Sequence, residues 1–187
     1  MSLKTLADIF RLHGARIAQA LAVLASLALT GCISSTTPVL SDAGAILGDR
    51  GRIHLFSASV GGEREHEVVS FRWSGSRYVL RGSPTGASDF TAHAVEGRDL
   101  IVQSRSSRPP HLIEYALARK LADGVYLVTA IDENDADDAT RERFCTKTQD
   151  ASCRVTTPEQ LFVFAHATAA KEDANGAIAV IVASKGR

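Results

Sequence analysis

Short stretches of alternating apolar and polar residues, separated by turn-forming residues, fill the central part of the chain. The clearest alternation places Val69, Phe71 and Trp73 on one side of a strand, and it resumes at 78–80 after Ser74-Gly75-Ser76. A period of two is typical of a half-buried strand, and two such runs joined by a short glycine-containing gap predict a β-hairpin.

Two further hairpins are predicted downstream. Residues 90–95 and 100–103 flank the turn Glu96-Gly97-Arg98-Asp99, and residues 111–117 and 125–131 flank a turn that ends in Asp123-Gly124. Six or seven short strands at a turn spacing of about 10 residues favour an antiparallel sheet. We therefore expect a mainly β (α+β) fold, in which a meander of about six to eight strands curls into a small barrel or a sandwich.

One C-terminal helix is predicted to pack on this sheet. Thr157-Pro158-Glu159-Gln160 combines an N-cap threonine, a proline at the first helical position and a glutamine at N3, which is a capping box. The helix should run to about Ala170. Its inner face is expected to consist of Leu161, Phe164, Ala165 and Thr168. Residues 177–183 are predicted to add a last strand at an edge of the sheet.

An acidic run, Asp132-Glu133-Asn134-Asp135-Ala136-Asp137-Asp138, separates the sheet from this helix. Read as an EF-hand loop, the run would need an oxygen ligand at Ala136, a glycine at Asp137 and a glutamate at Arg143, so it fails at three defining positions. A solvated loop followed by a short helix over 136–144 is the preferred interpretation. A calcium site of another kind is the alternative.

The first 31 residues differ from the rest of the chain. Basic residues at positions 4, 11 and 16 precede an uncharged apolar run over 17–29, which at roughly a dozen residues is too short to span a bilayer. The run ends in Leu29, Thr30, Gly31 and Cys32, a sequence that resembles the lipobox of bacterial lipoproteins. In that family the cysteine thiol receives a diacylglycerol, the chain is cut just before it, and the new amino terminus is acylated.

This resemblance implies that Cys32 is the first residue of the mature chain and that acyl chains such as palmitate anchor it in a membrane. Ile33, in place of an aspartate, favours the outer membrane over the inner, with the protein facing the periplasm. The expected organisation is a signal peptide over 1–31, a lipidated tether over 32–49 and a single β-rich domain over 50–187. The alternative is that residues 1–29 form a helix of the folded domain.

The cysteines are consistent with that compartment. Lipidation of Cys32 leaves Cys145 and Cys153, and an oxidising periplasm would join them. Their short loop gives a stabilisation of roughly 2.5 kcal/mol in the chain-entropy model. A redox-active or metal-binding pair is the alternative, but the spacing is not Cys-x-x-Cys, and no metal or cofactor is expected.

The charge balance gives no reason to expect nucleic acid as a partner. Removing residues 1–31 takes three of the 21 basic residues and one of the 21 acidic residues, which leaves a net charge near −2. The expected partners are the membrane, through the lipid anchor, and an envelope protein or another anionic envelope component.

The strongest candidate binding site contains Arg105 and Arg108, with Arg98 in the preceding turn. Guanidinium groups on neighbouring loops at one end of a sheet suit phosphate or carboxylate groups. Outer-membrane lipid, peptidoglycan peptide and an acidic protein would all supply such groups. The alternative is a solvated loop with ordinary surface arginines.

Motifs for catalysis are absent from the sequence. Gly82-Ser83-Pro84-Thr85-Gly86 is not Gly-x-Ser-x-Gly, and no histidine pair has metal-motif spacing. His111 is expected at the edge of the core and His93 in solvent, while residues 63–67 are expected to form a charged, solvated turn. We therefore predict an accessory or binding protein rather than an enzyme. The competing class is an envelope hydrolase whose serine, histidine and carboxylate come from separate strands.

Overall fold

The computed structural model describes residues 33–41, 43–58, 64–81, 89–95, 99–105, 111–147, 153–171 and 176–184. The predicted signal peptide and lipobox, with Cys32, lie outside these ranges, and so do Arg98 and Arg108. Among the described residues, no helix is both long enough and apolar enough to cross a membrane.

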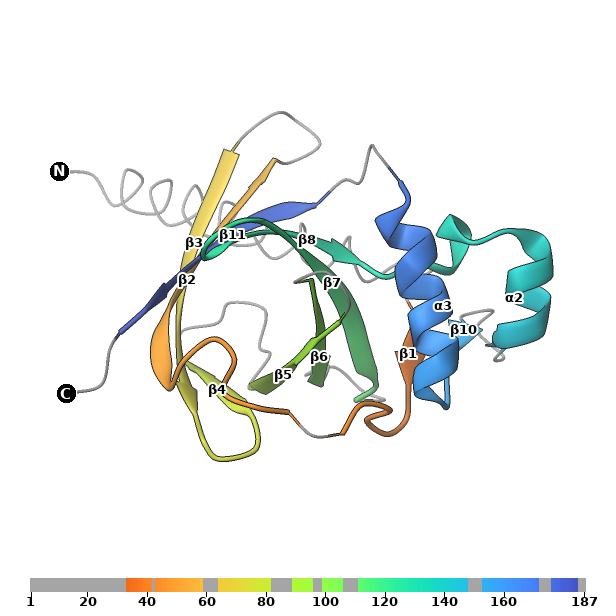
Figure 1. Ribbon diagram of the computed structural model, residues 1–187, viewed down its shortest axis with the longest axis horizontal. Coiled ribbons are helices and arrows are strands. Elements are labelled where there is room, and N and C mark those ends of the chain that lie inside the picture. Colours follow the sequence, from red (N-terminus) through yellow and green to blue (C-terminus); the bar gives the residue numbers. More distant parts are fainter. Residues whose placement is uncertain are drawn as a thin grey trace, which may run out of the picture.

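Eight of the described strands form a closed antiparallel barrel (Figure 1). In chain order they are β2 (Arg50–Ala58), β3 (Arg64–Trp73), β4 (Tyr78–Arg81), β5 (Asp89–Ala94), β6 (Leu100–Arg105), β7 (Ile113–Ala122), β8 (Val125–Ala130) and β11 (Ala177–Ala183). Consecutive strands pair with each other from β2 to β8. The predicted meander, curled into a small barrel, is confirmed.

The three predicted hairpins are also confirmed. Trp73 lies opposite Tyr78 across the β3–β4 hairpin, and Gly75 in its turn has a positive φ of 93°, which is a conformation that favours glycine. The β5–β6 and β7–β8 hairpins join the segments expected to form them.

β11 does not lie at a sheet edge, so that prediction is wrong. It pairs with β2 on one side and β8 on the other, and thereby closes the barrel. Its sequence, Ala-Ile-Ala-Val-Ile-Val-Ala, has no polar residue, so the side chains on both faces of this strand are apolar. The seam is tight at Gly51, opposite Ala183, where a Cβ would approach two carbons of the Phe71 ring to 2.8 and 2.9 Å.

The inside of the barrel contains an aromatic core. The side chain of Tyr78 is fully buried, stacks on Phe90 with 4.9 Å between ring centroids, and meets the Phe71 ring edge-on. Its hydroxyl accepts a hydrogen bond of 2.8 Å from the backbone N–H of Leu47, in the segment that leads into β2. Burial of the ring, the largest cause, raises the pKa of this hydroxyl. The chain before β2 therefore packs on one end of this core.

A second core lies outside the barrel, between β7 and the helix α3 (Pro158–Ala169; Figure 1). The predicted capping box is present: Thr157 Oγ1 accepts from the N–H of Gln160, and the Gln160 side chain accepts from the N–H of Thr157. The buried residues of α3 are those predicted for its inner face: Leu161, Phe164, Ala165 and Thr168. The prediction of a C-terminal helix packed on the sheet is confirmed.

The long connection from β8 to β11 carries the acidic run. It contains η2 (Glu133–Asp135), α2 (Asp138–Phe144), β9 (Thr146–Lys147) and β10 (Cys153–Arg154) before α3. Asp137 caps α2 by accepting from the N–H of Thr140, and this bond holds the pKa of Asp137 below its usual value. Asp135 accepts from Thr168 Oγ1 at 2.7 Å and pairs with Lys171. The short helix is confirmed, and Asp135 faces α3 rather than solvent.

The segment expected to be a tether instead packs on the barrel. β1 (Ser34–Ser35) pairs with β7 and with β10, and the Ser35 hydroxyl lies 2.6 Å from that of Tyr115. Ile33 is fully buried, and its N–H donates to the carbonyl of Ile131 at 2.9 Å. Isolated apolar residues in a polar, extended segment show no periodicity, which is why the sequence pattern resembles that of a spacer.

Candidate functional site

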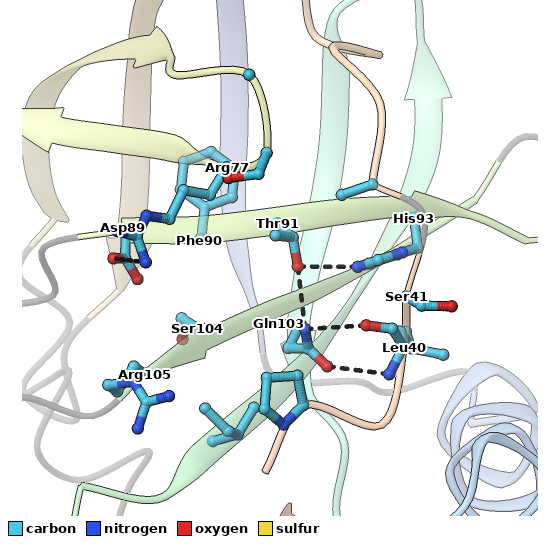
Figure 2. Close-up of a pocket in the computed structure, with 15 residues that line it drawn as sticks. Leu40, Ser41, Arg77, Asp89, Phe90, Thr91, His93, Gln103, Ser104 and Arg105 are labelled. Atoms are coloured by element: carbon cyan, nitrogen blue, oxygen red, sulfur yellow. Dashed lines mark hydrogen bonds and ion pairs between the residues drawn. The ribbon is translucent and has the colours of Figure 1, made fainter.

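A groove of about 390 Å³ on the outside of the barrel contains Arg105, one of the arginines predicted to bind an anion (Figure 2). Its floor is formed by β5 and β6. One wall, which we call the 38–43 wall, contains the described residues Pro38, Leu40, Ser41 and Ala43. The other is the β3–β4 turn with Arg77. Strand alternation turns Thr91 and His93 of β5 outward, because Phe90 and Ala92 point into the barrel core. His93 thus lies on the outer face, as predicted, although it is partly buried there.

A hydrogen-bonded network fixes the centre of the groove. The Gln103 amide group donates to Thr91 Oγ1 at 3.2 Å, and its oxygen accepts from the N–H of Leu40 at 3.3 Å. The Thr91 hydroxyl proton is then available to His93 Nε2, 2.8 Å away. Figure 2 shows this chain of contacts running from the 38–43 segment across both strands. The network holds the groove wall against its floor, which is a positioning role rather than an arrangement for nucleophilic attack.

Two arginines line the groove. Arg77 forms an ion pair with Asp89 at 3.3 Å, and Arg105 donates to the carbonyl of His111 at 3.5 Å. Both arginine side chains are exposed. In Figure 2 they lie on the same side of the groove, with Ser104 between Arg105 and the Arg77–Asp89 pair. Each guanidinium retains N–H donors beyond those in these contacts, so the pair can accept an anionic group.

The structure therefore places only part of the predicted arginine site. Arg105 lines the groove, while Arg98 and Arg108 lie outside the described residues. Sequence reasoning missed Arg77, which belongs to a turn far away in the chain and has no local signature. His111 is exposed and precedes β7 with a φ of 56°, so its predicted place at the core edge is wrong. A turn conformation there releases it from the strand alternation on which that prediction depended.

The disulfide between Cys145 and Cys153 is confirmed, with 5.2 Å between their Cα atoms. It joins the end of α2 to β10, which lies just before α3. The Glu133 carboxylate is 3.4 Å from Cys145 Sγ, and one ligand atom from each of the three residues lies within 4.8 Å of the others. Sulfurs that are bonded to each other offer no thiolate for a metal. In this form the two cysteines crosslink the connection between β8 and α3 rather than bind an ion.

Residues 64–67 form part of β3, so the expected solvated turn is wrong for this part; Glu63 lies outside the described residues. Glu67 alternates with Val69 and Phe71 and faces the barrel interior, where its Oε1 is buried without a hydrogen-bond partner among the described residues. Burial, and secondly the charge of Glu65, raise the pKa of Glu67 above its usual value.

Replacing Glu67 with glutamine is expected to stabilise the protein at neutral pH. Between the ordinary pKa and the raised one, the unfolded chain releases the proton more readily than the folded chain, so native stability falls as pH rises through that window. The gain from Glu67→Gln should be no more than about 1 kcal/mol at pH 7, because partial exposure screens the charge. Urea unfolding of both proteins at pH 4 and pH 7 measures it, and an equal gain at both pH values would contradict the ionisation argument.

No family model, no curated protein and no solved structure matches this chain.

Proposed function

We propose that this protein is a lipid-anchored, periplasm-facing binding module of the bacterial envelope, which holds an anionic group in the groove between Arg77 and Arg105. The observation that carries the proposal is the pair of exposed guanidinium groups beside a polar floor that is itself held by hydrogen bonds. A groove of about 390 Å³ is at the small end of the range for small-molecule sites, so it suits one phosphate or carboxylate-bearing group rather than a large ligand.

Geometry favours an anion over a cation at this position. Among the described residues that line the groove, the carboxylate is Asp89, and Arg77 forms an ion pair with it. Arg105, by contrast, contacts a neutral carbonyl oxygen and forms no ion pair with another described residue, so its positive charge is not compensated there. A bound phosphate or carboxylate would supply that compensation with charge-assisted hydrogen bonds. The 38–43 wall adds backbone groups, and its anchoring through Gln103 limits the ordering cost of binding.

Two features support the location. The lipobox-like sequence at Leu29–Cys32 implies lipidation, and the Cys145–Cys153 disulfide suits an oxidising compartment. Outer-membrane attachment follows from Ile33 after the cysteine and belongs to the same proposal. The groove residues would bind and orient the anionic group. The Thr91–His93 contact is part of the network that supports the groove wall.

Replacing Arg105 with alanine is expected to weaken anion binding about tenfold, the loss typical of one charge-assisted contact. The measurement is calorimetric titration with inorganic phosphate and, separately, with a short peptide that carries a free carboxylate. Arg143→Ala is the matched control, because Arg143 is an exposed arginine on α2, outside the groove lining. Equal affinities for Arg105→Ala, the control and the unchanged protein would refute the proposed groove site.

A further inference from the structure

Four arginines share the outer side of three neighbouring barrel strands, and we call this surface the arginine face. They are Arg50 and Arg52 of β2, Arg72 of β3 and Arg81 of β4, and all four side chains are exposed. Arg50 lies directly opposite Arg72, and Ser70 is paired with Arg52 on one side and Arg81 on the other. With strands about 4.8 Å apart, the four charges are concentrated on one small area.

This arrangement costs stability and has no compensation within the described part of the chain. Like charges directly opposite each other on paired strands repel, as Arg50 and Arg72 do. The ion pairs between described residues involve Arg77, Lys120, Arg141 and Lys171, and none of the four arginines. No described residue on the outer side of β2, β3, β4 or β11 is acidic. Asp49, which precedes Arg50, takes part in none of these ion pairs, and Asp89, which lies opposite Val79, is paired with Arg77.

Exposed apolar side chains adjoin the arginines on the same wall. Phe56, Val68 and Val182 are 43%, 42% and 53% exposed, and they make up half of the exposed large hydrophobic residues in the described ranges. Val182 lies directly opposite Arg52, and Val68 lies opposite His54, which is two residues from Arg52 on the same side of β2. We call Phe56, Val68 and Val182 the apolar strip. The His66 ring stacks on Phe56, with 4.4 Å between centroids, which limits the side-chain rotation of Phe56.

The composition of this surface is that of a protein interface. Interfaces are enriched in arginine and aromatic residues and depleted in lysine, aspartate and glutamate, and the described residues of this wall follow that pattern. The four strands β2, β3, β4 and β11 have 9, 10, 4 and 7 residues and lie about 4.8 Å apart, which gives an area on the order of 400–500 Å². That is about half of one partner's share in a standard interface, which indicates a transient complex.

We infer that the arginine face and its apolar strip dock a partner protein whose surface presents carboxylate groups. The wall is the convex outside of a barrel, so it suits a surface rather than a small ligand. β1, which directly follows the proposed lipidation site, lies on the other side of the barrel from β2, β3 and β4 (Figure 1). The arginine face is therefore turned away from the anchoring membrane, and this choice of a protein over a bilayer rests on the proposed anchor.

The decisive variant is Arg50→Glu, because it separates binding from stability. It replaces the repulsive Arg50–Arg72 pair with an attractive one, so a purely structural cluster would gain thermal stability and change nothing else. If the face docks an acidic surface, the same variant gains stability and loses affinity. Arg143→Glu, on α2 away from this wall, is the charge-matched control, and Arg105→Ala reports on the groove separately.

The probe is a fluorescein-labelled peptide of alternating glutamate and leucine, titrated by fluorescence anisotropy against the full-length protein. We expect saturable binding, and we expect Arg50→Glu to weaken the peptide affinity about tenfold. The affinity of the unchanged protein should increase when the salt concentration is lowered from about 0.5 M to 0.05 M. Arg143→Glu and Arg105→Ala should stay within about twofold of the unchanged protein. A peptide with lysine in place of glutamate should not bind.

Three results would overturn the inference. The first is peptide affinity that is equal in the unchanged protein and in Arg50→Glu. The second is Arg50-dependent binding to phosphatidylglycerol vesicles that exceeds binding to the peptide, which would make a bilayer the occupant. The third is self-association by sedimentation that Arg50→Glu abolishes, which would make the occupant a second copy. The two proposals fail separately. Phosphate affinity that Arg105→Ala leaves unchanged refutes the groove site alone, and peptide affinity that Arg50→Glu leaves unchanged refutes the arginine face alone.

Discussion

Phe164→Ala is expected to lower the free energy of unfolding by about 3–5 kcal/mol, which is the usual cost of truncating a large aromatic residue in a core. Phe164 is fully buried and belongs to the second core, outside the barrel, with Tyr115 and Leu117 of β7. This core holds α3 on the barrel, and α3 in turn contacts the acidic run over 132–138 through the Thr168–Asp135 hydrogen bond. Chemical denaturation followed by far-ultraviolet circular dichroism measures the loss.

Phe162→Ala is the matched control for this change. It removes the same side chain two residues earlier in the same helix, but Phe162 is 37% exposed. Its loss should cost clearly less, about 1–2 kcal/mol, because more than a third of this residue is already exposed to solvent and its removal leaves no enclosed cavity. Similar losses for both variants would show that α3 does not pack on β7 through the Leu161–Phe164 side.

Cys32→Ala is expected to abolish membrane attachment. The proposed anchor depends on several acyl chains at this one residue, and each buried CH₂ contributes about 0.8 kcal/mol, so losing all of them removes the whole attachment. The chain should also remain uncut, since cleavage in lipoproteins follows modification of the cysteine. Membrane fractionation and intact mass measurement, with the native signal in a Gram-negative host, report both effects.

Cys145→Ala is the control for the loss of a cysteine as such. It should stay with the membrane and lose only the disulfide, which non-reducing peptide mapping detects. A Cys32→Ala protein with unchanged mass and unchanged partitioning would reject the lipoprotein proposal. It would also remove the basis for preferring a protein over a bilayer at the arginine face.

Local signals were strong enough to predict most elements of the fold. The capping box at Thr157–Gln160 and the alternation around Phe71 each depend on residues close in sequence, and both the helix and the hairpins are present. Barrel closure was beyond such signals. Whether β11 ends a sheet or joins β8 to β2 depends on the curvature of seven other strands, which no local pattern encodes.

The candidate site was predicted less completely, for the same reason. Arg105 was found because arginines cluster near it in the sequence, whereas Arg77 and the 38–43 wall reach the groove only through folding. The arginine face has no sequence signature either. Arg50 and Arg72 are separated by 21 intervening residues, and only the β2–β3 register places them opposite each other.

The burial of Ile33 has a mechanical consequence for a protein anchored at the preceding residue. One residue spans at most about 3.5 Å, so the link between an acylated Cys32 and the buried Ile33 would be very short. The domain would then rotate little relative to the bilayer and would stay close to its surface. Inserting a flexible spacer before Ile33 would release that restraint without altering the groove.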